Sequence, residues 1–196
     1  MIDQLIDKMV DLVKQKGLEL MSRYPADLLV HDRRFLQENL VEGVTIAWVV
    51  GNSHTHCALV GISEEQSDLI WHLSSLNESD VYCRIDVRNG KAAVKELSRQ
   101  QFTDLSKIKP AYSARFDWQF DVRHGNDCVG HVRIEPKGSL ENRAYDITVF
   151  PESNASAKDL VGLQQMAKRG AARQHGSLFW RGEIIVKSDK ELCYEH

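Results

Sequence analysis

The sequence predicts an α+β protein built on mostly antiparallel sheet. Residues 2–22 carry apolar side chains at three- and four-residue steps, which is the period of a helix with one buried face. Later segments either alternate apolar and polar residues, as in 115–123, or are rich in β-branched residues, as in 44–50. Asn89-Gly90 joins two such segments and is a strong signal for a tight antiparallel hairpin.

We expect the chain to begin with two helices. The first covers residues 2–22, and Pro25 interrupts before a second helical segment at 26–40. Both segments carry an apolar stripe at helical spacing. Gly43 then marks the change to the shorter period of strands.

The middle of the chain shows the same arrangement twice, a hairpin followed by a helix. Segments 44–50 and 54–62 form the first expected hairpin, and 81–88 and 91–97 form the second. A capping-box sequence follows each hairpin, namely Ser63-Glu-Glu-Gln66 and Ser98-Arg-Gln-Gln101. The two copies repeat at roughly 35 residues but share few side chains, so we predict two hairpin–helix units.

Strands predominate after Pro110. A three-stranded meander is expected from segments 115–123, 128–135 and 143–150. A helix with Ser156 as its N-cap residue and a last strand at 177–187 complete the prediction. We expect two domains, 1–110 and 111–196, with a single domain 1–196 as the alternative.

Composition limits the function classes. The net charge is −3 and the pI is near 6.2, which argues against non-specific nucleic-acid binding. The four cysteines are widely spaced and include no Cys-x-x-Cys pair, so a zinc ribbon is not expected. The N-terminus is acidic and amphipathic, unlike a secretory signal, and no apolar run is long enough for a membrane span. We therefore expect a cytoplasmic protein with reduced thiols and no contact with membrane.

The hairpin from Phe116 to Lys137 has a register that its apolar residues specify. A three-residue loop, Gly125-Asn126-Asp127, keeps the apolar residues of both strands on one face. In that register Phe120 lies opposite Val132 and Trp118 lies opposite Ile134. The other face then pairs residues with polar side chains: Asp121 with His131, Gln119 with Arg133, and Asp117 with Glu135.

One interpretation of this polar face is a catalytic metal site. Asp117 and Glu135 would repel each other, and Mg²⁺ or Mn²⁺ bound by them and by Asp146 would relieve the repulsion. The metal would activate a water molecule, with Lys137 beside a scissile phosphate. The same residues also suit the solvated side of an antiparallel sheet, and Pro136 is expected to end the strand at this point. The solvated face is the favoured interpretation.

Histidine and cysteine spacing suggests two further metal sites. His54 and His56 would project from one face of a strand, but no third ligand can be assigned to them. His124, Cys128 and His131 are spaced like metal ligands. Strict alternation, however, places Cys128 on the apolar face and His131 on the polar face, so we expect no site there.

Cations gather near the end of the last predicted helix. They could contact a phosphate or a nucleic acid, and the residues are Lys168, Arg169, Arg173, His175 and Arg181. Cations also favour helix C-termini for electrostatic reasons alone. Residues 31–34, His-Asp-Arg-Arg, are expected to form a solvated helix face.

Two classes of function follow. The first is a non-catalytic intracellular binding protein, of adaptor or inhibitor type, with no cofactor. Its partner would be another protein, or nucleic acid at the local basic patch. The alternative is a divalent-metal-dependent nuclease or phosphodiesterase that uses Asp117, Glu135 and Lys137 with Mg²⁺ or Mn²⁺.

Overall fold

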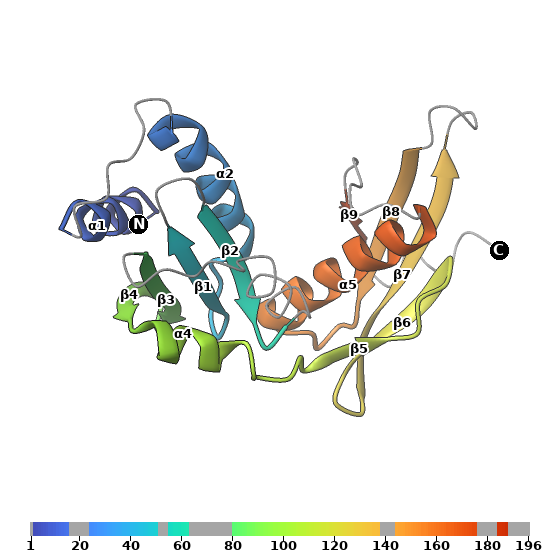
Figure 1. Ribbon diagram of the computed structural model, residues 1–196. Helices are drawn as coiled ribbons and strands as arrows, with labels where there is room; N and C mark the ends of the chain where they lie inside the picture. The colour runs from blue at the N-terminus through green and yellow to red at the C-terminus, as the bar shows by residue number, and fades with distance from the viewer. Residues whose placement is uncertain are drawn as a thin grey trace. The chain divides into compact units, whose positions relative to one another are not determined.

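The structure is a computed structural model that describes residues 2–15, 24–50, 55–62, 80–137, 144–175 and 184–187, without the side chains of 24–31, 55, 144 and 175. Within these ranges the chain forms helices and two mostly antiparallel sheets, which confirms the predicted α+β class (Figure 1). The chain divides into two compact units, Met1–Pro110 and Ala111–His196. That each unit folds alone stays a prediction. No helix in the described ranges is long and apolar enough to cross a membrane.

The first unit holds a four-stranded antiparallel sheet in the order β2-β1-β3-β4. Its strands are β1 (Thr45–Val50), β2 (Thr55–Val60), β3 (Val81–Arg88) and β4 (Lys91–Leu97). Both expected hairpins are present, and β1 also pairs with β3. Because β1 is covered on both faces, its sequence is a continuous apolar run and not an alternating one.

The turn between β3 and β4 has the predicted chemistry. Asn89 and Gly90 both have positive φ, at 52° and 68°, as a type I′ turn requires. The Glu42 carboxylate accepts hydrogen bonds from the backbone N–H groups of Asn89 and Gly90, at 2.9 and 3.2 Å. The residues that join the first hairpin, 51–54, and the helix expected after Ser63 lie outside the described residues.

Helix α4 (Arg99–Leu105) begins at the second predicted capping box. The Gln101 N–H donates to the Ser98 hydroxyl at 3.2 Å, and the Ser98 N–H donates to the Gln101 side-chain oxygen at 3.0 Å. The box therefore satisfies two backbone donors that a helix start would otherwise leave without partners.

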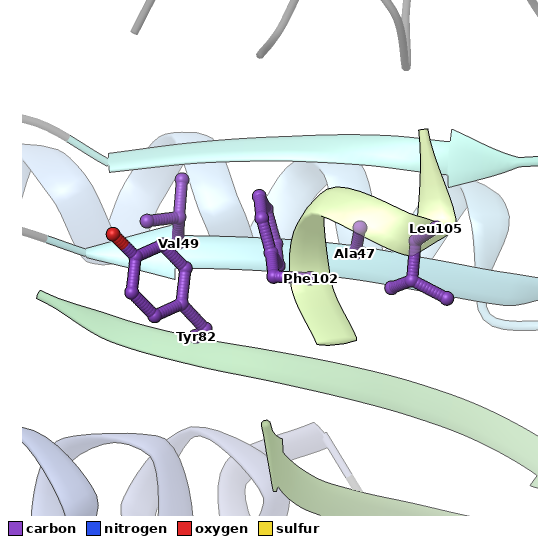
Figure 2. Packing of buried hydrophobic residues seen from close by; sticks show 5 residues of the cluster. All are labelled: Ala47, Val49, Tyr82, Phe102 and Leu105. Atoms are coloured by element: carbon purple, nitrogen blue, oxygen red, sulfur yellow. The ribbon is translucent and has the colours of Figure 1, made fainter. Parts of the chain in front are cut away.

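The buried face of α4 packs on the first sheet. Figure 2 shows Phe102 and Leu105 of the helix against Ala47 and Val49 of β1 and Tyr82 of β3. The Tyr82 and Phe102 ring centroids lie 5.0 Å apart, and Phe102 is fully buried. This cluster covers one face of β1.

Two helices precede the first sheet. Helix α1 (Ile2–Gln15) buries Leu5, Ile6, Met9 and Val13, the apolar face predicted from their spacing. Helix α2 (Tyr24–Asn39) begins one residue before Pro25, because a proline in the first turn lacks only an N–H that would have no partner there. Residues 16–22, expected as the end of the first helix, lie outside the described ranges.

The second unit holds a five-stranded sheet in the order β5-β6-β7-β8-β9. Its strands are β5 (Tyr112–Ala114), β6 (Gln119–His124), β7 (Asp127–Lys137), β8 (Ala144–Pro151) and β9 (Ile184–Val186). The meander β6-β7-β8 is antiparallel as predicted, and β9 pairs parallel to β8. Residues 115–118, expected at the start of a long strand, are not strand, so Trp118 keeps 41% of its surface exposed and does not join the core.

Helix α5 (Ala157–His175) covers the apolar face of this sheet (Figure 1). The helix approaches closely at two glycines. A Cβ at Gly162 would lie 2.6 Å from the Tyr112 ring, and one at Gly170 would lie 2.7 Å from the Phe120 ring. These positions let aromatic side chains of the sheet fill the space beside the helix backbone.

The hairpin β6–β7 follows the predicted register in part. The inner pairs match it: Gln119 with Arg133, Phe120 with Val132, and Asp121 with His131. The loop was predicted wrongly, because it has two residues, Gly125 and Asn126, and not three. A β-bulge that leaves Val129 unpaired in β7 joins this shorter loop to the inner register.

Candidate functional site

Side chains with metal-ligand chemistry meet on the polar face of the second sheet. Asp121 comes from β6, and Cys128 and His131 come from β7. One ligand atom of each lies within 4.8 Å of the others, and within the described ranges this is the one group of three or more His, Cys, Asp or Glu so arranged. Nδ1 of His131 lies 2.7 Å from Oδ1 of Asp121, and Nε2 lies 3.2 Å from Oε1 of Glu152. Both ring nitrogens therefore face a carboxylate.

The bulge at Val129 creates this group. Strict alternation placed Cys128 on the apolar face, and that prediction was wrong. The bulge pairs Cys128 with Arg123, which lies on the same face as Asp121, and it turns the Val129 side chain into the core. The Glu152 N–H donates to the Val129 carbonyl at 3.0 Å, which ties the bulge to the segment that supplies the second carboxylate.

The electrostatics of the group favour a cation. Burial, together with the negative charges of Asp121 and Glu152, raises the pKa of the Cys128 thiol, and Arg123 opposes this in part. A reactive thiolate needs the opposite, a lowered pKa, so this is not the environment of a cysteine nucleophile. The His131 and Asp121 side chains are 41% and 52% exposed, so a dissolved ion can reach them.

The predicted catalytic residues lie apart from this group. Strand pairing ends at Gln119 with Arg133, so the expected pair of Asp117 and Glu135 does not form. Asp117 accepts a hydrogen bond from the Trp118 N–H at 2.8 Å. Lys137 forms an exposed ion pair with Asp146, with Nζ 2.8 Å from Oδ2.

Besides this ion pair, a second adjacency in the predicted set occurs. Glu135 lies opposite Asp146 in the β7–β8 ladder. Asp117, Glu135 and Asp146 nevertheless do not form a group of converging ligand atoms in the part of the chain that the structure describes.

The histidine pair on the first sheet can be placed only in part. His56 lies exposed on β2. His54 lies outside the described residues, so a site formed by the two stays a prediction.

The cations near the end of α5 are organised by an aromatic ring. Arg169 and Arg173 each place Cζ 5.9 Å from the ring centroid of Phe116. Phe116 in turn meets Phe120 edge-on, with centroids 5.3 Å apart. Lys168 is half-buried on α5. The His175 side chain and Arg181 lie outside the part of the chain that the structure describes.

Phe116 was not predicted as part of this basic region. Its neighbour Trp118 stacks near Tyr145, with ring centroids 6.0 Å apart, and leaves much of the indole exposed. We call Phe116, Trp118, Arg169 and Arg173 the Phe116 patch. Its aromatic members come from the short segment between β5 and β6, and its cations come from α5.

Sequence reasoning also missed a second polar cluster, at the start of α5. The Tyr112 hydroxyl donates to Oδ1 of Asp159 at 2.8 Å, and Nδ1 of His124 lies 2.9 Å from the same oxygen. The Ser156 hydroxyl donates to Oδ2 at 2.6 Å. The signal available in the sequence is the spacing Ser156-x-x-Asp159, a capping box with aspartate in place of glutamate.

This second cluster fixes ionisation states. Partial burial opposes ionisation of Asp159, but hydrogen bonds from Ser156, Tyr112 and His124 outweigh it and lower its pKa to about 2. Burial and the Asp159 carboxylate raise the pKa of Tyr112. The cluster joins β5 and β6 to the helix, and we assign it a structural role.

One residue of the segment 31–34 is not solvated as predicted. Asp32 is only 7% exposed, because it faces the first sheet. The Trp48 indole donates to Oδ2 of Asp32 at 2.9 Å, and the Cys57 thiol donates to Oδ1 at 3.6 Å. Burial and the Asp32 charge raise the pKa of Cys57 well above its usual value, which agrees with an unreactive thiol.

Comparisons with models of known protein families, with curated proteins and with solved structures found no match.

Proposed function

We propose that this protein is a non-catalytic binding protein, and that its Phe116 patch docks a protein partner through an acidic segment. The observations that support this are the exposed Trp118 and, two residues before it in the chain, the Phe116 ring over which two guanidinium groups are held. Tryptophan, arginine and other aromatic residues are the types most enriched at the centres of protein interfaces.

The energetics of the patch suit binding. A partner that covers Trp118 removes apolar surface from water, and each Å² of apolar surface buried in this way stabilises the complex by about 25 cal/mol. Contact with the Phe116 ring restricts the Arg169 and Arg173 side chains, so less side-chain entropy is lost when they bind a carboxylate. An arginine guanidinium donates two parallel hydrogen bonds to a carboxylate, which fixes the relative orientation of the two groups.

Charge favours a protein partner over a nucleic acid. A nucleic-acid strand is bound by a row of cations along successive phosphates, and the chain as a whole carries a net charge of −3. Asp117 and Glu135 are exposed on the same hairpin and would repel a phosphate backbone. A short acidic segment needs only one or two carboxylates near Arg169 and Arg173.

The test is to capture a partner from a native lysate with the full chain, and then to repeat the binding experiment with the purified chain and the purified partner. We expect Trp118→Ala and Arg173→Glu each to lose the protein that the unmodified chain retains. Ile108→Ala is the matched control, because Ile108 is an exposed apolar residue of the first unit at 44% exposure. Equal retention by all variants would contradict the proposal, and capture that nuclease treatment abolishes would indicate nucleic acid.

The divalent-metal nuclease stays a prediction that no specific contact favours. It requires that Mg²⁺ or Mn²⁺ raise the melting temperature of the protein and support cleavage of DNA or RNA, and that Asp117→Ala and Glu135→Ala abolish both effects. An intracellular partner and a cytoplasmic location stay predictions as well.

A further inference from the structure

The polar face of the second sheet carries a donor set that protein–protein docking at the Phe116 patch does not use. A thiol, an imidazole and a carboxylate converge there from two strands, with ligand atoms within 4.8 Å. Thiolate and imidazole are the donors that Zn²⁺ and related transition metals prefer, and Mg²⁺ and Ca²⁺ do not select sulfur. The set is therefore chemically distinct from an acidic surface cluster.

We propose that Asp121, Cys128 and His131 bind one Zn²⁺-type transition-metal ion. The ion would take the place between Nδ1 of His131 and Oδ1 of Asp121, which now lie 2.7 Å apart. Nε2 of His131 would keep its contact with Glu152. This is the arrangement in which a carboxylate orients a metal-bound histidine through its second nitrogen.

Ion binding displaces protons. The Cys128 thiol loses its proton to solvent as the sulfur–metal bond forms, and any proton on Nδ1 of His131 leaves in the same way. The charged groups that face the sulfur are Asp121 and Arg123 of β6 and Glu152 beyond β8. Because the metal competes with these protons for the ligand atoms, metal affinity should rise as the pH is raised.

The site has three protein ligands and an accessible side. His131 and Asp121 are both well exposed, so water or a group from a partner completes the coordination. The bulge is essential to this geometry, since without it Cys128 would point into the core. A bulge that served only to shape the strand would not require a thiol, an imidazole and a carboxylate to converge on its outer side.

The decisive experiment is a Co²⁺ titration of the full chain, followed by thiolate-to-cobalt absorption, with Zn²⁺ added afterwards to displace the Co²⁺. We expect one ion per chain and complete displacement. Cys128→Ser should abolish the absorption, and His131→Gln should weaken binding and change the spectrum. Glu152→Gln should weaken binding by about 10- to 100-fold, the usual effect of removing a hydrogen-bonding support of a metal ligand.

Two controls separate the site from its surroundings. Asp127→Asn removes an exposed carboxylate from the same hairpin, and Cys57→Ser replaces a thiol in the first unit; both should bind Co²⁺ like the unmodified chain. The melting temperature of each metal-free variant shows whether it is folded. If a ligand variant does not fold, Asp121→Asn is titrated with Co²⁺ in its place. Absence of the absorption at millimolar Co²⁺, or its persistence in Cys128→Ser, would overturn the proposal.

Discussion

At the scale of single residues, carboxylates organise both units. In the first unit, Asp32 accepts hydrogen bonds from an indole N–H and a thiol. In the second unit, Asp159 accepts hydrogen bonds from two hydroxyls and lies beside an imidazole nitrogen. A partly buried carboxylate is costly unless several donors surround it. In each case at least one donor comes from a strand, so a single side chain joins a helix to a sheet.

Asp159 should give the second unit a recognisable pH dependence. Its pKa is lowered to about 2 from 3.8, so its ionised form stabilises the fold above pH 4, and this contribution is lost as the pH falls toward 2. Asp159→Asn should therefore lower the free energy of unfolding by about 1 to 2 kcal/mol at pH 7. The difference from the unmodified protein should shrink below pH 4, as measured by urea unfolding.

Asp127→Asn, at an exposed position of the neighbouring hairpin, is the control for this prediction. It should change the free energy of unfolding by less than about 0.5 kcal/mol. A difference between Asp159→Asn and the unmodified protein that is independent of pH from 2 to 7 would show that the carboxylate charge is unimportant.

At the scale of elements, sequence reasoning predicted the inner register of β6–β7 but not its loop. The apolar residues Phe120 and Val132 have to share a face, and that requirement held. A loop with an odd number of residues is one way to meet this requirement, but a two-residue loop with a bulge meets it equally well. Gly125 has φ +63° at the first loop position, as such a loop needs. A glycine inside a strand, Gly130, was the available signal for the bulge.

Gly130 should tolerate no side chain. A Cβ there would lie 2.6 Å from the Phe150 carbonyl oxygen and 2.6 Å from Cδ2 of Leu163. A side-chain methyl can move, but a carbonyl in a strand cannot move without disturbing the β7–β8 ladder. Gly130→Ala should therefore destabilise the protein by about 1 to 3 kcal/mol, measured by chemical denaturation. Asn126→Ala, in the exposed loop, should have little effect, and an equally small effect of Gly130→Ala would contradict the close approach.

Helix α4 should depend strongly on its cap. It has only 7 residues, so propensity alone cannot maintain it, and its N-terminus is closed by Ser98 and Gln101. Ser98→Ala should cost about 1 kcal/mol of stability and increase hydrogen exchange in α4. Ser113→Ala, on exposed β5, serves as the comparison, and matching exchange rates in both variants would show that the cap is dispensable.

Across the whole chain, the sequence predicted which segments form helices and strands, but not which side chains from distant segments come together. Helical spacing, β-branched runs and turn residues are local signals, and the α+β class and the element order followed from them. The Phe116 patch joins residues about fifty positions apart, and no local pattern encodes that contact. The group of Asp121, Cys128 and His131 was not predicted, because one unpaired residue, Val129, reverses the face on which Cys128 lies.

The two units on either side of Pro110 should fold independently. In the described ranges each sheet takes all its strands from one unit, and each has a helix packed on its own apolar surface. Fragments 1–110 and 111–196 should therefore each give the circular dichroism and cooperative urea transition of a folded domain. The full chain should then show two transitions, whose slopes equal those of the fragments.

A cut between Asn89 and Gly90 is the control, because it separates β3 from β4 within one ladder. Fragments 1–89 and 90–196 should leave the first sheet incomplete, and 1–89 should lack a cooperative transition. If fragments 1–110 and 111–196 are also unfolded alone, while the full chain unfolds in one step with a larger slope, the two units form a single cooperative domain. Their core residues would then depend on contacts beyond those within each sheet, and stability changes from Gly130→Ala and Ser98→Ala would appear in the same transition.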